Sequence, residues 1–355
     1  MASRTMDGKS SSLRIGWRSA GMLVIALVAL AGARGSAAQT LTMYFIDVEG
    51  GQSTLIVSPS GESLLVDTGY AGNDGRDAGR VVAAAQAAGI KRIDYLLITH
   101  FHGDHVGGVP EVAKRLPIGT FVDHGAPPAN PDPRVLEPFK AFAAVRASGH
   151  HIHAKPGDRI PVKGLDVQVV SSSTEVINAP LAGGGQVNRA CEPAARPAAE
   201  PLENPQSTGI HLQYGRFRFL DLGDLTGPPL YALFCPANRL GPIDLLLVPH
   251  HGGPDVASPA LFAVQPRVAI MNNGATKGGS PEAYDALHQA VASRGLQDVW
   301  QVDKSANAGV RNFADERIAN LDEKTGHWIK VSASQDGSFV VTNGRTGRSV
   351  AYRPK

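Results

Sequence analysis

The chain has 355 residues, of which 43% are hydrophobic and 19% are charged, values that are ordinary for a globular protein. A formal net charge of +2 over this length is not the electrostatic footprint of a protein with a dedicated nucleic-acid surface. We therefore expect a sizeable buried core, and the composition says nothing about the oligomeric state.

Residues 1–38 have the three-part layout of a secretory signal peptide. Basic Arg14 and Arg18 precede the apolar run "AGMLVIALVALAGA", and the small residues "GSAAQT" follow it, so we place cleavage near Ala38–Gln39. The apolar run is shorter than the roughly 20 residues that span a bilayer. We expect a mature chain of residues 39–355, periplasmic or secreted, without a transmembrane segment after cleavage.

Three β-type runs open the mature chain: "LTMYFIDV", "STLIVSP" and "ESLLVDTG". The turn formers "EGGQ" and "SPSG" separate them, which predicts an antiparallel meander. Asp77–Ala88 has helical spacing, and Gly89 marks the expected helix end. The continuous apolar run "IDYLLITH" then predicts a strand that is buried on both faces.

Helices and strands continue to alternate along the rest of the chain. We expect helices near residues 106–116, 134–148, 229–234 and 258–263 and in "SPEAYDALHQAVASRG", and strands in "IGTFVDH", "LDVQVVS", "GIHLQYG", "RFRFLDLGD", "IDLLLVPHHGG", "RVAIMNNG", "HWIKVSAS" and "SFVVTN". The strands come in runs separated by single helices, twice over, without a repeat of roughly 20 to 50 residues. This order predicts a single α/β domain of two β-rich halves with helices outside.

A Pro/Ala-rich segment at about residues 179–206 predicts a long loop. Cys191 lies in this loop, and Cys235 is the other of the chain's 2 cysteines. In an exported protein two cysteines can form one disulfide, which would tether the loop. The alternative is a pair of free thiols.

The stretch "LLITHFHGDHVGG" places His100, His102, Asp104 and His105 within six positions, directly after an apolar run. Imidazole nitrogens and carboxylate oxygens are good ligands for zinc, manganese and iron. The two histidines that flank Phe101 can reach one ion, while Asp104 and His105 can turn toward a second. A His-rich surface loop is the alternative, and a structural zinc site is disfavoured because such sites are usually closed and cysteine-rich.

The stretch "THFHGDHVGG" resembles the signature of the metallo-β-lactamase superfamily. The segments "FIDVEGGQSTLIVSPSGESLLVDTG", "ENPQSTGIHLQYGRFRFLDLGDLT" and "DLLLVPHHGG" are similar, in series, to the hydrolase domain of the competence-type DNA-uptake proteins. Together these matches cover nearly the whole mature chain. The resemblance implies an α/β (α+β) fold, a four-layer αββα sandwich, with two divalent metal ions at the sheet edges. Zinc is the expected metal, with manganese or iron as alternatives.

The resemblance also implies ligand roles, residue by residue. The histidines of "HFH" would bind the first ion, and Asp104 and His105 the second. Asp224 in "LGDLT" would bridge both ions. One histidine of "PHHGG" would complete the second site; we favour His250, which is nearest to the strand end, and keep His251 as the alternative.

Three aspartates near predicted strand ends have alternative interpretations. Asp224 is plausible as a carboxylate that ends a strand, or as the N-cap of the following segment. Asp221 is a weaker bridge because it lies inside the strand, where its side chain should alternate away from the site. Asp67 in "LLVDTG" is expected to accept a hydrogen bond from a ligand histidine or a loop amide, or else to be an ordinary turn residue.

One departure from the superfamily pattern concerns the first ion. Many members have a further histidine ligand roughly twenty residues before the bridging aspartate, where this chain has "ENPQS" with Asn204, as competence-type relatives also tend to have. The first site is therefore expected to lack one protein ligand. His211 can substitute only if its strand register points it inward.

The loop "MNNGATKGGSPEAY" is the expected source of substrate contacts. Asn273 and Lys277 lie in it, and the loop would cover the metals and grip an anionic group. The alternative is a helix-entry loop with Ser280 as the N-cap. Competence-type relatives often have a histidine near this helix start, and its absence argues against nuclease activity.

Two ions that share a carboxylate can hold a hydroxide between them, because metal coordination lowers the pKa of water toward about 7. Asp104 or Asp224 would handle the proton, so the predicted chemistry is hydrolysis of a small-molecule or phosphoester substrate. A phosphoester or phosphodiester is the first expectation. The alternatives are a carboxylic ester or lactone (including acyl-homoserine lactones), a β-lactam, or a non-catalytic metal-binding scaffold. Walker-type and "GxSxG" patterns are absent from the sequence.

Overall fold

The structure is a computed structural model that describes Gly8 and residues 40–191, 197–198, 202–256, 258–322 and 324–354. The predicted signal peptide lies outside the described residues except for Gly8, as do residues 192–196 and 199–201 of the predicted loop. Thr40–Lys355 forms one compact unit. Among the described residues, no helix combines the length and the apolar character needed to cross a membrane.

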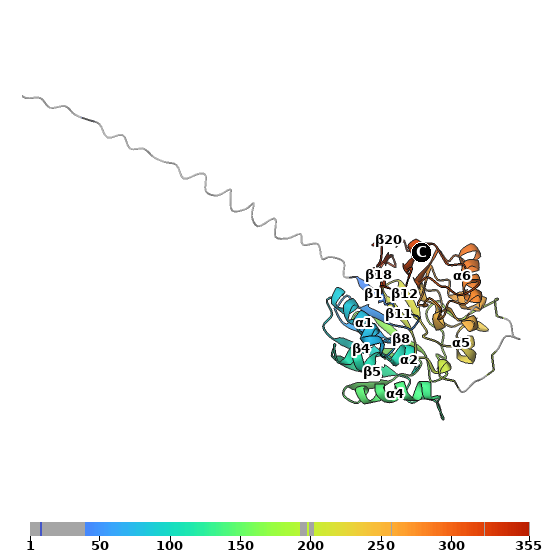
Figure 1. Cartoon of the computed structure of the whole chain (residues 1–355). Helices are drawn as coiled ribbons and strands as arrows, with labels where there is room; N and C mark the ends of the chain where they lie inside the picture. Colours follow the sequence, from blue (N-terminus) through green and yellow to red (C-terminus); the bar gives the residue numbers. More distant parts are fainter. Residues whose placement is uncertain are drawn as a thin grey trace, which may run out of the picture. The chain divides into compact units, whose positions relative to one another are not determined.

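The first sheet joins the N-terminal strands to the C-terminal ones (Figure 1). Within the described residues it has nine strands in the order β20-β19-β18-β1-β2-β3-β4-β5-β6. The strands are β1 (Leu41–Phe45), β2 (Thr54–Val57), β3 (Ser63–Val66), β4 (Ile93–Leu97), β5 (Ile118–Asp123), β6 (His150–His153), β18 (Ile329–Ala333), β19 (Phe339–Asn343) and β20 (Ser349–Tyr352). The antiparallel meander predicted for β1 to β3 is confirmed, and β3 to β6 are parallel.

The second sheet also has nine strands within the described residues, in the order β17-β16-β15-β14-β12-β11-β8-β7, with β9 paired to β8. The strands are β7 (Arg159–Ile160), β8 (Asp166–Ser172), β9 (Glu175–Val176), β11 (Gly209–Tyr214), β12 (Phe217–Asp221), β14 (Leu245–Leu247), β15 (Val268–Met271), β16 (Asp298–Asp303) and β17 (Ile318–Asn320). The predicted hairpin of β11 and β12 is confirmed, and β12 to β17 are parallel.

The two sheets pack face to face because their strands alternate apolar side chains toward each other. Met43 and Phe45 of β1 belong to the core between the sheets, where the rings of Phe45 and Phe219 lie 5.8 Å apart. Tyr44, between them in sequence, points to the outer face and meets Trp328 at 5.5 Å between ring centroids. The side-chain alternation of a single strand thus supplies two different cores.

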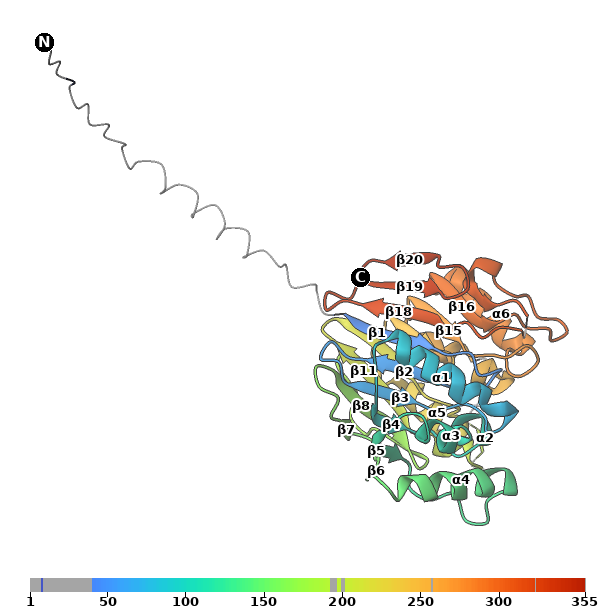
Figure 2. The same cartoon turned by 60° about the vertical axis from the view of Figure 1, so that its left-hand side comes forward.

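Helices cover the outer face of each sheet, as Figures 1 and 2 show for α1 and α4 on one side and α5 and α6 on the other. The helices are α1 (Arg76–Ala87), α2 (Gly103–Val106), α3 (Val109–Ala113), α4 (Pro133–Arg146), α5 (Gly227–Phe234) and α6 (Pro281–Ser293). Short 3₁₀ turns are η1 (Asn73–Gly75), η3 (Asn204–Gln206), η4 (Pro249–Gly252), η5 (Pro254–Val256), η6 (Pro259–Val264) and η7 (Asp315–Arg317). The predicted four-layer αββα arrangement is confirmed.

Two predicted helices differ from the structure. The helix expected over residues 106–116 is divided into α2 and α3, because the N–H of Gly108 donates to the backbone oxygen of Gly69 and the backbone oxygen of Asp104 accepts from the N–H of Gln52, both at 3.0 Å. The helix expected near residues 258–263 is the 3₁₀ turn η6. The sequence analysis also missed β16, a short strand whose buried residues include the polar Gln301 and Asp303.

The predicted disulfide between Cys191 and Cys235 is present. It joins the Pro/Ala-rich segment to the residue that follows α5. In the described part of that segment, β10 (Gln186–Val187) pairs with β13 (Ala237–Asn238), so backbone hydrogen bonds and a covalent link hold the same two stretches together.

Candidate metal centre

Side chains that follow three strand ends converge at one edge of the two sheets. His100 comes three residues after β4 ends, Asp224 three residues after β12 ends, and His251 lies in the η4 turn shortly after β14. β12 and β14 are parallel neighbours, and the carboxyl ends of parallel strands meet at the same edge of a sheet. The fold itself therefore brings these distant segments together.

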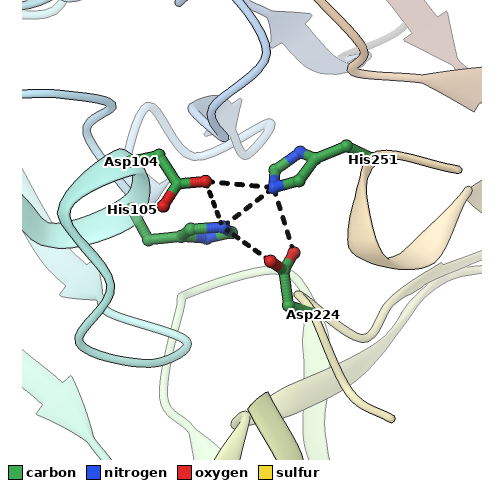
Figure 3. A group of neighbouring side chains, drawn as sticks. All are labelled: Asp104, His105, Asp224 and His251. Atoms are coloured by element: carbon green, nitrogen blue, oxygen red, sulfur yellow. Dashed lines mark hydrogen bonds and ion pairs between the residues drawn. The ribbon is translucent and has the colours of Figure 1, made fainter. Parts of the chain in front are cut away.

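Four buried side chains form the centre of this edge: Asp104, His105, Asp224 and His251 (Figure 3). One ligand atom from each lies within 4.8 Å of the others. Nε2 of His105 is 3.1 Å from Nε2 of His251 and 3.2 Å from Oδ2 of Asp224. Oδ2 of Asp104 is 3.4 Å from Nε2 of His105 and 3.3 Å from Nε2 of His251.

The electrostatics of the group keep its carboxylates charged. Burial alone would raise the pKa of Asp104 and Asp224, but the neighbouring His105 and His251 hold both values well below the usual range. Burial opposes a charge on His105, yet the carboxylates of Asp224, Asp104 and Asp67 raise its pKa well above the usual value. For His100, burial and the nearby His105 lower the pKa instead. The centre thus concentrates buried negative charge beside imidazole nitrogens.

These residues fit a divalent metal ion. Nδ1 of His105 is 2.7 Å from Oδ2 of Asp67, so Nε2 faces the centre, where an ion that displaces its proton would bind. Oδ1 of Asp224 is buried without a hydrogen-bond partner among the described residues and lies 3.2 Å from Nε2 of His251. Two imidazoles and two carboxylates are a donor set that zinc, manganese and iron all accept.

Asp67 lies where the sequence analysis placed it, immediately after β3 and against a ligand histidine. Its side chain is fully buried, and its Oδ1 accepts from the backbone N–H of Thr99 at 2.8 Å. Its Oδ2 accepts from the Thr99 hydroxyl and from Nδ1 of His105, both at 2.7 Å. The carboxylate therefore fixes the ring orientation of His105.

The pair predicted for the first ion lies beside this group. Nε2 of His100 is 2.9 Å from Nδ1 of His102 and 3.8 Å from Oδ2 of Asp224. Asp224 thus lies close to His105 and His251 and also faces His100, which is compatible with the bridging position predicted for it. It is not the N-cap of α5, where Thr226 takes that position, and Asp221 points instead to Gln52.

The two histidines of "PHHGG" lie in different places relative to the four-residue group. His251 is buried and belongs to the four-residue group, whereas the favoured His250 is 30% exposed and lies 3.8 Å from Asp224 Oδ2. Both residues have positive φ, 48° and 51°, so the chain turns sharply and aims the consecutive rings differently. Because of this turn, the ring of His251, and not that of the favoured His250, lies with Asp104 and His105, the residues predicted for the second ion.

The remaining predicted residues are divided between the centre and its surroundings. Lys277 forms an ion pair with Oδ2 of Asp104, and Nδ2 of Asn204 is 3.2 Å from Nε2 of His250. Asn273 points elsewhere, with its Nδ2 donating to the backbone oxygens of Asp303 and Gly274.

The alternative predicted for Ser280 is also correct, since its side chain caps α6 by accepting from the N–H of Ala283 at 3.1 Å. The same loop thus both caps the helix and places Lys277 at the centre.

His211 does not meet the condition set for it as a substitute ligand. Its neighbours Ile210 and Leu212 point into the core between the sheets, so His211 lies on the opposite face of β11. Burial, with Arg218 nearby, lowers the pKa of His211 to about 4.

Sequence reasoning missed several residues that support the centre. Oε1 of Glu203 accepts from the backbone N–H of Phe101 at 2.8 Å and lies 2.9 Å from Nε2 of His124, which holds the loop between the two histidines of "HFH". Asp255 contacts Nδ1 of His250 at 2.8 Å. An acidic residue beside each ligand motif was the available signal, in "LEN" and in "HHGGPD".

Comparison with known proteins identifies the fold. Residues 46–187 match the family model described as the Metallo-beta-lactamase superfamily. Residues 46–187 therefore resemble a metallo-β-lactamase superfamily domain, and the predicted metallo-β-lactamase fold is confirmed. The matched region ends before Asp224 and His251, so the second half of the centre rests on the geometry described above.

The proteins to which this chain is similar are named for different activities. It is 26% identical over 263 residues to a UPF0173 metal-dependent hydrolase of Cupriavidus necator, a match that covers 70% of this chain and 80% of that protein. It is 36% identical over 67 residues to an atrochrysone carboxyl ACP thioesterase of Cryptosporiopsis sp., which covers 19% of this chain and 20% of the thioesterase. Among solved structures, the diiron β-hydroxylase CmlA of Streptomyces venezuelae is 16% identical with a TM-score of 0.44, covering 74% of this chain and 52% of CmlA.

Proposed function

We propose that this protein is a metal-dependent hydrolase. The observation that carries the proposal is the convergence of Asp104, His105, Asp224 and His251 from three separate segments into one buried set of ligand atoms. A divalent ion bound there supplies Lewis acidity, which lowers the pKa of a water molecule and polarises the bond under attack. The UPF0173 relative, named as a metal-dependent hydrolase, supports the same class of reaction.

The chain's own residues divide the remaining work. Asp67 holds the ring of His105 in one orientation through its 2.7 Å contact with Nδ1, so that Nε2 keeps facing the centre. Asp104 and Asp224 are the charged groups that can accept the proton of the attacking water, and both are almost fully buried.

A phosphoester or phosphodiester is the proposed substrate. Lys277 places an ammonium group against Asp104, and the same group lies 5.4 Å from the ring centroid of Tyr70. Its side chain is 39% exposed, so it is accessible at the mouth of the centre. A cation in this place attracts an anionic substrate and stabilises negative charge that develops in the reaction. The motif resemblance to competence-type hydrolase domains favours a phosphoester, and the missing histidine at the start of α6 argues against nucleic acid as that phosphoester.

A carboxylic ester or lactone, including an acyl-homoserine lactone, is the second candidate. A cavity of about 250 Å³ lies beside Asp255 and is lined mainly by apolar side chains, among them Leu230, Phe234 and Leu261. Such a cavity would accept an acyl group. Relatives named as an ACP thioesterase and as a hydroxyacylglutathione hydrolase of Stenotrophomonas maltophilia also support cleavage at a carbonyl carbon.

The proposal also includes the location of the protein and the identity of its metal ion. The signal-peptide pattern of residues 1–38 supports a periplasmic or secreted protein, and the Cys191–Cys235 disulfide is compatible with an oxidising compartment. Zinc is the proposed metal, and the two histidines and two aspartates would also accept the alternatives, manganese and iron.

The test is a substrate panel on the purified protein supplied with Zn²⁺ or Mn²⁺. The panel contains bis-p-nitrophenyl phosphate, acyl-homoserine lactones and nitrocefin, and turnover of the phosphodiester alone supports the first candidate. Asp104→Ala should abolish turnover, while the matched control Asp285→Ala, an exposed aspartate on α6, should keep it. Full activity in Asp104→Ala refutes the metal mechanism. Absence of turnover on every substrate with metal bound favours a non-catalytic scaffold.

A further inference from the structure

His250 has a distinct place around Asp224, although it lies outside the four-residue group. Oδ1 of Asp224 is 3.2 Å from Nε2 of His251. Oδ2 instead faces Nε2 of His105 at 3.2 Å and Nε2 of both His100 and His250 at 3.8 Å. His250 therefore approaches the same carboxylate oxygen as His100, from a different segment of the chain.

Asp255 determines which nitrogen of His250 faces the centre. Its two carboxylate oxygens lie 2.9 and 2.8 Å from Nδ1 of His250. A carboxylate only accepts hydrogen bonds, so Nδ1 donates and Nε2 can present its lone pair toward Asp224. Asp67 does the same for His105, so the centre contains two histidines that are each oriented by a carboxylate.

The side-chain amide of Asn204 lies beside the same position. Its Nδ2 is 3.2 Å from Nε2 of His250, and its Oδ1 is buried without a hydrogen-bond partner among the described residues. Rotation of the amide by half a turn exchanges these two atoms. An ion in front of His250 would then meet the amide oxygen in place of the amide nitrogen.

We propose that His250 is a ligand of the first metal ion, together with His100, His102 and Asp224, and that Asp255 is its positioning residue. This inference rests on the metal-dependent function proposed above and deepens it, because it supplies the protein ligand that the first site lacks. His251 then serves the second ion with Asp104 and His105. The two adjacent histidines of "PHHGG" are thereby assigned to different ions.

Metal binding tests the assignment without any turnover. The metal-free protein is titrated with Zn²⁺ by calorimetry, and the bound metal is counted by elemental analysis after dialysis. The wild-type protein should bind two ions. His250→Ala should weaken one of them by at least about 100-fold and leave the other unchanged, and Asp255→Asn should weaken the same ion by about 10- to 100-fold.

Double variants show which ion is affected. Residues that serve one ion are not independent, so His100→Ala combined with His250→Ala should still bind one ion tightly. His251→Ala combined with His250→Ala should bind neither. The exposed Asp285→Asn is the surface control, and circular dichroism of each metal-free variant verifies folding.

Three results would overturn the proposal: binding of one ion by the wild-type protein, two tight ions in His250→Ala, or loss of both ions in the His100→Ala/His250→Ala pair. Two ions in a protein without hydrolytic activity would refute the proposed function and leave this assignment intact.

Discussion

Replacing Asp67 by asparagine removes the charge that orients His105 and keeps almost the same side-chain shape. Asp67 has a φ of 58°, a left-handed conformation that asparagine also adopts readily. The backbone after β3 should therefore be undisturbed. Any effect of Asp67→Asn can be assigned to the side-chain contacts.

The size of the effect follows from those contacts. Three donors converge on the two oxygens of Asp67: the N–H and the hydroxyl of Thr99, and Nδ1 of His105. Asparagine offers only one oxygen, so at least one buried donor loses its acceptor, at a cost of about 1–3 kcal/mol in the free energy of unfolding. If the donor that loses its acceptor is Nδ1 of His105, metal affinity should fall by about 10- to 100-fold.

Competition with a chelator of known affinity measures the affinity for the metal ion. Urea unfolding of the metal-free protein measures the free energy of unfolding. His105→Ala is the reference for complete loss of the ligand, and Asp285→Asn is the surface control. If Asp67→Asn binds metal as tightly as the wild-type protein while His105→Ala does not, Asp67 does not orient the ligand and this reasoning is wrong.

Three further predictions concern stability and substrate binding. Replacing Cys191 and Cys235 by serine opens a loop with a sequence separation of 44, so urea unfolding should show a loss of about 4 kcal/mol; an unchanged midpoint would contradict the tether. Burial raises the pKa of Asp221 to about 7, whereas the unfolded chain has the ordinary value of 3.8, so the metal-free protein should lose stability as the pH rises from about 4 to 7. Asp221→Asn should then be the more stable protein at pH 8, by at most about 4 kcal/mol, and lose that advantage near pH 4; parallel stability curves would refute the shift. Lys277→Ala should raise KM for a phosphodiester by about tenfold, the equivalent of about 1.4 kcal/mol, and leave KM for a neutral ester unchanged; an equal change for both would exclude an anion grip.

The sequence predicted the parts of the centre that depend on local spacing. His100 to His105 follow a continuous apolar strand, and Asp224 follows an alternating one, so their positions at strand ends could be inferred directly. The strand and helix periodicities predicted a mixed α/β class with two β-rich halves and helices outside, whereas the four-layer arrangement was implied by the resemblance to the metallo-β-lactamase superfamily.

The parts that depend on contacts between distant segments were not predictable. Backbone turning in η4 decides between His250 and His251, and the spacing of the motif carries no information about φ. Lys277 meets Asp104 across 173 positions, a contact that only the packing of two sheets creates. β16 escaped notice because Gln301 and Asp303 interrupt its apolar pattern, although both are buried and Gln301 has hydrogen-bond partners from Tyr284 and Phe313.

The pairing of β1 with β18 has a consequence for how this unit forms. Leu41 pairs with Ala333, so β1 can complete its pairing only after β18, which lies almost 300 residues later in the sequence, has folded against it. Long-range pairings of this kind raise the contact order, which slows folding because the intervening chain must first be ordered. Until β18 arrives, one edge of β1 presents unpaired backbone groups to other chains. Aggregation during refolding should therefore be sensitive to the C-terminal hairpin that supplies β18.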